Sequence, residues 1–144
     1  MDLLDNSVFD LPLYSINNIK CQGRIVDIYD GDTITIVFKL GNQLQKHKIR
    51  LYGINTPELK GSTRNEGIIA RNFLLSQIIG NELELEKEYK RNQIVDMLKE
   101  CKKLFTFELL GEEKYGRVLG KVYNGDECLN DLLLLHGYAK EYIL

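Results

Sequence analysis

The chain has few of the residues that build disulfide frameworks or zinc sites. Its 144 residues include three cysteines, two histidines and two prolines, and no tryptophan. Cys21, Cys101 and Cys128 lie far apart and form no CxxC or Cys/His spacing. An odd number of dispersed cysteines favours free thiols in a reducing compartment over a disulfide framework or a zinc site.

Long hydrophobic runs and secretion signals are also missing from the sequence. No stretch contains enough consecutive apolar residues to cross a bilayer. The first twenty residues carry Asp2 and Asp5 and have neither a basic region nor a continuous apolar core, which excludes the pattern of a secretory signal. We therefore expect a soluble, intracellular protein without a membrane partner.

Neither sign of charge dominates. The 19 Lys and Arg residues and 21 Asp and Glu residues give a formal net charge of −2. Any binding of nucleic acid must therefore depend on a local basic patch, which argues against a packaging protein. The length and the 44% of hydrophobic residues fit one globular domain with its own core, which we expect to be monomeric.

Apolar periodicity and turn residues divide the chain into short elements. Alternating patterns predict five strands, at 23–30, 33–39, 47–52, 104–109 and 117–123. A sixth, half-buried strand is predicted at 82–86. Helical spacing predicts helices at 64–79 and 127–136, which Gly80 and Gly137 would end. A charged stretch at 87–103 predicts a helical excursion between two strands.

Strands paired by turns, with a helix between strands and a terminal helix, predict an α+β, mainly β fold. The strand count fits an OB-fold, a five-stranded β-barrel with about three helices. Residues 1–20 lack clear periodicity and are expected to form an N-terminal arm or extension. Residues 21–144 then form the barrel domain, with the inserted excursion at 87–103.

Two arginines and several oxygen-bearing side chains stand at turns and strand ends, where a core does not need them. Arg50 alternates with Ile49 and Leu51 and should point away from the face that they bury. Arginine forks grip phosphate oxygens in a fixed plane, and carboxylate and carbonyl oxygens suit a hard cation such as Ca²⁺. Together these residues have the chemistry of a phosphodiester site.

Each of these residues also has an ordinary structural interpretation. Arg50 and Arg117 could form surface salt bridges, and Asp32 could cap backbone N–H groups in a turn. Glu58, after Pro57, could be an acid near a helix N-terminus. Tyr115 could simply pack at the rim of the barrel.

Four motifs occur in the order seen in the staphylococcal nuclease-like (thermonuclease) family, which the sequence resembles from about residue 23 to residue 140. They are Asp30-Gly31-Asp32-Thr33, Arg50 through Glu58, Lys114-Tyr115-Gly116-Arg117 and Gly137-Tyr138-Ala139-Lys140. Four ordered motifs are far more specific than one alone. The resemblance implies an OB-barrel endonuclease that uses Ca²⁺, with other divalent metals left open, to hydrolyse DNA or RNA, single-stranded or unpaired. It would act with little sequence preference and leave 3′-phosphate ends.

The resemblance also implies roles for individual residues. Arg50, Glu58 and Arg117 match the catalytic positions: the arginines clamp the phosphate, and the carboxylate activates or orients water. Asp32, Asn55 and Thr56 match the positions around the metal. Lys114 and Tyr115 match positions near the bound nucleotide.

Three features depart from the family pattern. Asn55 replaces a second aspartate ligand, Glu113 replaces the aspartate before Lys114, and the 87–103 excursion lengthens a connection. Asn55 keeps a second function open, that of a catalytically degenerate OB module which binds nucleic acid or a protein partner. Retention of Arg50, Glu58 and Arg117 together favours the enzyme.

Overall fold

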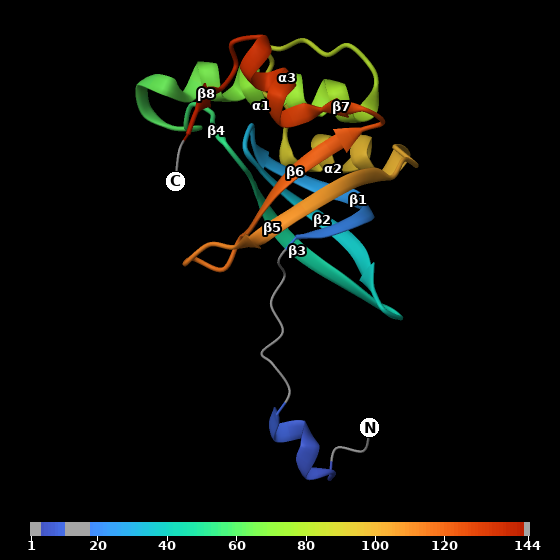
Figure 1. Ribbon diagram of the computed structural model, residues 1–144. Helices are drawn as coiled ribbons and strands as arrows, with labels where there is room; N and C mark the ends of the chain where they lie inside the picture. Colours follow the sequence, from blue (N-terminus) through green and yellow to red (C-terminus); the bar gives the residue numbers. More distant parts are fainter. Residues whose placement is uncertain (1–3, 11–17, 143–144) are drawn as a thin grey trace.

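A five-stranded barrel forms the body of the protein. The computed structural model describes residues 4–10 and 18–142. The barrel strands are β1 (Ile19–Asp30), β2 (Thr33–Leu40), β3 (Gln43–Leu51), β5 (Phe105–Glu112) and β6 (Val118–Asn124). They run in the order β3-β2-β1-β5-β6, and a parallel pairing of β3 with β6 closes the sheet on itself (Figure 1).

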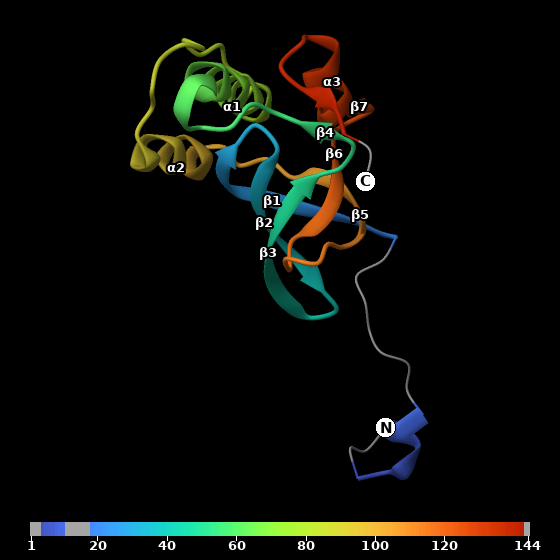
Figure 2. The same ribbon diagram turned by 90° about the vertical axis from the view of Figure 1, so that its left-hand side faces the viewer.

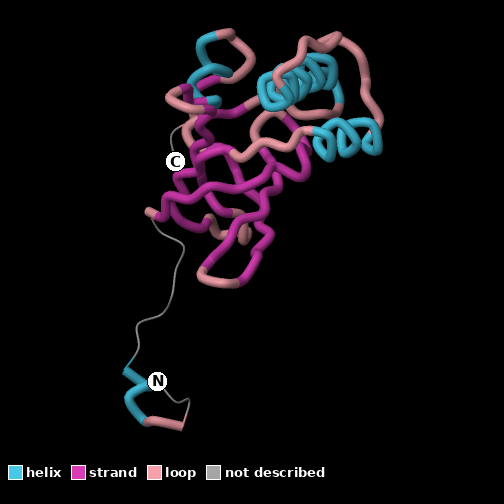
Figure 3. The backbone as a smooth tube through the Cα atoms, turned by 90° about the vertical axis from the view of Figure 1, so that its right-hand side faces the viewer, coloured by secondary structure: helices cyan, strands magenta, loops and turns pink. Residues whose placement is uncertain are grey.

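Helices and short strands complete the fold. The helices are α1 (Arg64–Ile79), α2 (Arg91–Glu100) and α3 (Leu129–Leu135), with 3-10 turns η1 (Asn6–Asp10) and η2 (Gly61–Thr63). The short strands are β4 (Ile54–Asn55), β7 (Glu127–Cys128) and β8 (Lys140–Glu141). Figure 3 shows α1, α2 and α3 gathered at one end of the barrel strands. The expected α+β OB-fold, with five barrel strands and three α-helices in the described chain, is confirmed.

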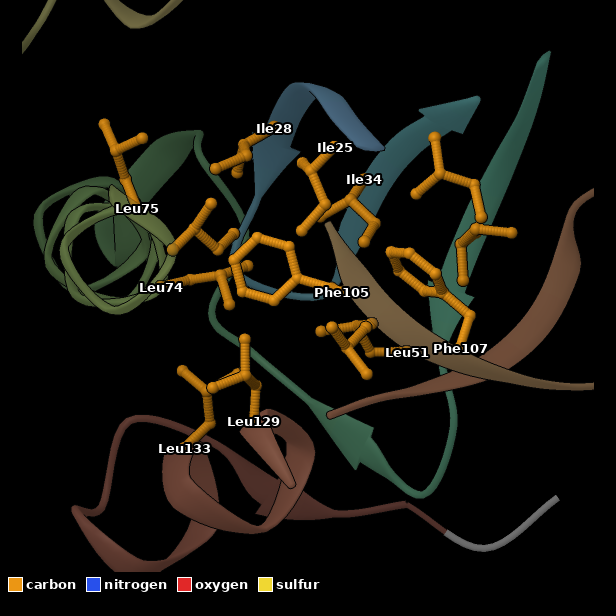
Figure 4. Packing of buried hydrophobic residues seen from close by; sticks show 14 of the residues in the cluster. Ile25, Ile28, Ile34, Leu51, Leu74, Leu75, Phe105, Phe107, Leu129 and Leu133 are labelled. Atoms are coloured by element: carbon orange, nitrogen blue, oxygen red, sulfur yellow. The ribbon is translucent and has the colours of Figure 1, made fainter. Parts of the chain in front are cut away.

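Aliphatic and aromatic side chains fill the barrel and the layer beneath α1 and α3. Leu74 and Leu75 of α1 and Leu133 of α3 belong to the same core cluster as Phe105 and the fully buried Phe107 of β5 (Figure 4). Ile49 and Leu51 point into this core, as their alternation predicts. The polar residue between them, Arg50, therefore lies on the other face of β3, where it lines both pockets described below.

Strand β1 departs from simple alternation. Its pairing with β2 is shifted between Ile25 and Asp27 and again between Ile28 and Asp30. Ile25 and Ile28, three residues apart, are both buried. These irregularities are β-bulges, which re-aim side chains and are frequent beside active sites.

The strand expected at 82–86 does not form. Leu83 and Leu85 pack against the core, as their alternation suggests, but residues 82–86 join no sheet. The buried Asn72 side chain of α1 instead donates to the carbonyls of Leu85 and Lys87, both at 2.7 Å. This loop ends at α2, so the helical part of the excursion lies at 91–100.

The N-terminal arm is only partly described. Residues 6–10 form η1, residues 11–17 lie outside the described range, and Ile19 and Lys20 already belong to β1. Cys21, Cys101 and Cys128 are free thiols. Of the helices in the described ranges, none combines the length and apolar character that a bilayer crossing demands.

Candidate functional site

Two neighbouring pockets contain all eight candidate site residues. The acidic pocket, a cavity of about 400 Å³, is lined by six of them: Asp32, Arg50, Asn55, Thr56, Glu58 and Arg117. The tyrosine pocket, about 530 Å³, contains the other two, Lys114 and Tyr115, together with Tyr142. Arg50, Asn55 and Arg117 line both pockets, so they form the wall between them.

Asp32 is held against the segment that carries Asn55 and Thr56. Its Oδ2 accepts a hydrogen bond of 2.9 Å from the Thr56 backbone N–H, and its side chain is nearly buried. Gly31 permits this approach, because a Cβ atom there would lie 2.8 Å from Thr56 Cγ2 and 3.0 Å from Ala70 Cβ. The β1–β2 turn therefore places Asp32 against Thr56, the residue that follows β4.

The Arg50 guanidinium is largely buried and is held by backbone and side-chain contacts. Its Nη1 donates to the carbonyls of Leu51 (3.1 Å) and Ile54 (2.9 Å) and lies 3.4 Å from Asp32 Oδ2. Its Nη2 donates to Asn55 Oδ1 at 3.3 Å. Only 13% of the Arg50 side chain is exposed. Arg50 is therefore not a surface residue held by a simple exposed salt bridge.

Glu58 is the exposed acid of the acidic pocket. About three quarters of its side chain is accessible, and the nearest cation, Lys60 Nζ, lies 3.8 Å from its Oε2. The backbone beneath it is fixed, because the Glu58 carbonyl accepts a 2.9 Å bond from Thr63 Oγ1. Gly67 of α1 also packs so closely that a Cβ atom would lie 2.8 Å from that carbonyl oxygen.

Arg117 reaches the pockets from the loop between β5 and β6. Its Nε and Nη2 donate to the carboxylate of Glu113, four residues earlier, the second at 3.1 Å. This hydrogen bonding raises the pKa of Arg117 above its ordinary value, so the guanidinium stays charged. Glu113 thus orients Arg117 by a contact within one loop.

Lys114 and Tyr115 lie at the tip of the same loop and reach the tyrosine pocket only. Lys114 Nζ lies 5.1 Å from the centre of the Tyr115 ring, and 75% of Tyr115 is exposed. The opposite wall comes from Tyr142, whose ring centre is 5.7 Å from the Arg50 guanidinium carbon. Exposed aromatic rings beside cations offer a surface on which nucleobases can stack.

Asp30 also lines the acidic pocket. Its Oδ1 accepts a 3.0 Å bond from the backbone N–H of Asp32. Burial, and then the neighbouring Asp32 carboxylate, raise the pKa of Asp30 from its ordinary value of 3.8 to about 7. Burial, together with the neighbouring Asp32 carboxylate, therefore makes the Asp30 carboxyl resist ionisation.

This raised pKa predicts how stability depends on pH. The unfolded chain loses the Asp30 proton at lower pH than the folded protein, so Asp30 costs stability as the pH rises from about 4 to about 7. We expect metal-free wild type to lose stability over that interval relative to Asp30→Asn, in urea unfolding with EDTA. Parallel pH profiles for the two proteins would contradict the assignment.

Sequence reasoning gave no role to several residues of the pockets. Asp30 belongs to the first of the four motifs, but sequence analysis assigned it no role. Its position two residues before Asp32 is the sequence feature that could have indicated one. Tyr142 is brought in by the pairing of β8 with β4, and its backbone N–H donates to the Gly53 carbonyl at 2.9 Å. Asp27, Lys48 and Arg91 also line the acidic pocket and carried no motif signal.

The donor atoms of the acidic pocket are mixed oxygens. Among residues 4–10 and 18–142, no group of three or more His, Cys, Asp or Glu side chains has the geometry of a metal site. A cation here would therefore depend on amide, hydroxyl or carbonyl oxygens besides carboxylate. Thr56 Oγ1 is buried and has no hydrogen-bond partner in the described chain.

Two comparisons with known proteins point to the same family. Residues 48–144, which include every candidate site residue except Asp32, match the family described as staphylococcal nuclease homologue. A thermonuclease from Staphylococcus intermedius is 31% identical over 130 residues, which cover 88% of this chain and 63% of that relative. The chain therefore spans less than two thirds of the relative's length. With the barrel and the ordered motifs, the match shows that this chain belongs to the staphylococcal nuclease family.

Proposed function

We propose that this protein is a Ca²⁺-dependent endonuclease that hydrolyses phosphodiester bonds of single-stranded or unpaired DNA or RNA with little sequence specificity. The observation that carries the proposal is the shared acidic pocket. Two arginines, an exposed carboxylate and a set of oxygen donors line one cavity of about 400 Å³. A structural salt-bridge cluster has no need to keep Glu58 open to solvent on the same cavity as the two arginines.

The oxygen donors fit a hard cation. We assign the Asp32 carboxylate, the Asn55 amide oxygen and Thr56 as the groups that would hold Ca²⁺, which accepts carboxylate, amide and backbone oxygens alike. The buried, unpartnered Thr56 Oγ1 supports this choice, since a buried polar atom without a partner is costly in the described structure. When bound, the ion supplies electrostatic stabilisation of the phosphate.

The side chains divide the remaining chemistry among them. Arg50 and Arg117 place guanidinium groups from β3 and from the β5–β6 loop on the pocket, where they can bind the equatorial oxygens of one phosphate. Negative charge grows on those oxygens in the transition state, so fixed cations stabilise it most there. As the water oxygen bonds to phosphorus, Glu58 accepts the proton of that water and the bond from phosphorus to the 5′ oxygen breaks. The 5′ oxygen takes a proton from solvent and leaves as a hydroxyl, so the phosphate stays on the 3′ oxygen.

The second candidate is a binding module with a degenerate site, and Asn55 favours it. The Asn55 Oδ1 accepts a hydrogen bond from Arg50. The amide therefore makes a structural contact at a position where a carboxylate would bind a cation. The tyrosine pocket, with Lys114 and Tyr115, would then provide most of the binding. The two candidates differ in whether the metal switches on turnover.

Digestion of single-stranded DNA and RNA over a Ca²⁺ titration tests the proposal. We expect wild type to cleave with Ca²⁺, to be inert in EDTA and to saturate only at high Ca²⁺. Asn55→Asp restores one unit of charge beside the ion, and a gain of only ~1.4 kcal/mol tightens binding about tenfold. We therefore expect Asn55→Asp to bind Ca²⁺ more tightly, by calorimetry, and to be faster at limiting metal. A folded Asn55→Asp protein that is inert at every Ca²⁺ concentration would establish the binding module.

A further inference from the structure

A second polar row lies beside the proposed catalytic residues on the barrel surface. Thr33 and Arg50 are paired across β2 and β3, and two residues further along both strands Thr35 is paired with Lys48. Thr35 also faces Asp27 of β1. Two residues of a strand span ~7 Å. That offset is comparable to the separation of successive phosphates in an extended single strand.

Helix α2 places an arginine at the end of this row. Arg91, the first residue of α2, forms an ion pair with Asp27, and 58% of its side chain remains exposed. Arg91, Asp27, Thr35 and Lys48 all line the acidic pocket that contains Arg50 and Arg117. The lining of the cavity therefore includes a second pair of cations, Lys48 and Arg91, besides Arg50 and Arg117.

The position of Arg91 is fixed by the packing of α2 on β1, which Figure 2 shows from the side. Ile94 and Leu98 of α2 are buried in the core. Arg24 of β1 donates to the Lys99 carbonyl at the other end of the helix, at 2.9 Å. The excursion thus presents Arg91 from a rigid element and not from a loose loop.

Two further arginines, Arg64 and Arg71, lie near Arg91 without lining the pocket. Burial, and then Arg64 and Arg91, lower the pKa of Arg71, which shows that three arginines of α1 and α2 lie close together. Arg64 forms an ion pair with Glu88. Asp27 contacts Arg91 through one nitrogen of the guanidinium group, Nη2. An arginine has five N–H donors, so Arg91 can bind a phosphate while it keeps its contact with Asp27.

We propose that Arg91, Lys48 and Thr35 form a second phosphate subsite, which binds the phosphate adjacent to the scissile one in a single-stranded nucleic acid. This subsite rests on the proposed function for its substrate. In this proposal the 87–103 excursion has a function, because its helix α2 contributes Arg91 as a substrate-positioning residue. It also predicts that longer substrates are bound better than a dinucleotide that carries one phosphate.

The test measures binding without cleavage. The affinity of a fluorescently labelled single-stranded hexanucleotide is followed by anisotropy in EDTA, for wild type, Arg91→Gln and Lys48→Gln. We expect each variant to bind on the order of tenfold more weakly at low salt, and the slope of log K against log salt to fall by up to about 0.7, the value of one single-strand phosphate contact. Because both residues hold one phosphate, the double variant should lose less than the product of the single losses.

Matched controls separate this subsite from a general charge effect. Lys99→Gln removes a cation from the last turn of α2, away from the pocket, and should bind like wild type. Asp27→Asn with Arg91→Gln tests whether the loss comes from an uncovered carboxylate, and it should bind more weakly than Asp27→Asn alone. A dinucleoside monophosphate, used as competitor, should bind wild type and Arg91→Gln equally.

The outcomes distinguish the subsite from the proposed activity. Hexanucleotide binding within twofold of wild type in Arg91→Gln, or an equal loss in Lys99→Gln, overturns the subsite, whether or not the enzyme cleaves. Arg91-dependent binding supports it even if digestion with Ca²⁺ shows no turnover, a result that would overturn only the nuclease activity.

Discussion

Replacing Arg50 or Arg117 by lysine is expected to lower kcat by at least about a hundredfold, the loss typical of removing one transition-state hydrogen-bond donor. Both guanidinium groups line the acidic pocket from separate elements, so neither can take the place of the other. A lysine keeps the charge but offers a single point in place of a planar fork that matches two phosphate oxygens. The measurement is single-turnover cleavage of single-stranded DNA at saturating Ca²⁺.

The two variants should differ in stability, which provides an internal control. Arg50 donates to the carbonyls of Leu51 and Ile54, so its lysine variant loses about 1–3 kcal/mol from carbonyls left without a partner. The Arg117–Glu113 pair lies within one loop and lysine keeps its charge, so Arg117→Lys should lose less stability than Arg50→Lys. Arg24→Lys, away from both pockets, should lower stability without changing kcat. A folded Arg117→Lys with wild-type kcat would contradict the clamp assignment.

Local signals in the sequence were sufficient for most of the fold. The β1–β2 turn at Asp30-Gly31 and the helix 64–79 formed as expected, and Gly80 ends α1 in the left-handed conformation. Ile49 and Leu51 face the core, so Arg50 faces the pocket. These features follow from apolar periodicity and turn chemistry, which depend on neighbours in the chain.

The features that sequence reasoning missed depend on distant contacts. The bulges of β1 bring Asp27 and Asp30 to the pocket while Ile25 and Ile28 stay buried, and simple alternation cannot give that arrangement. The segment 82–86 alternates like a strand, but Asn72 of α1 binds its backbone instead. Arg91 enters the pocket only because α2 packs on β1.

Glu58 can be tested without disturbing the fold. Its side chain is 73% exposed, and the contacts that fix this segment are made by its backbone carbonyl to Thr63 and by the close approach of Gly67. Glutamine has the same shape as glutamate and keeps these contacts. Glu58→Gln therefore removes a proton acceptor and one charge, with the cavity otherwise intact.

We expect Glu58→Gln to lower kcat by about 10²- to 10⁴-fold, the range that a general base contributes, while hexanucleotide binding stays within a fewfold of wild type. The matched control is Glu66→Gln, which removes an exposed carboxylate from the first turn of α1, outside both pockets. An equal loss of kcat in both variants would assign the effect to net charge. If Glu58→Gln loses binding and turnover together, Glu58 positions the substrate or the ion, because loss of a proton acceptor alone leaves ground-state binding unchanged.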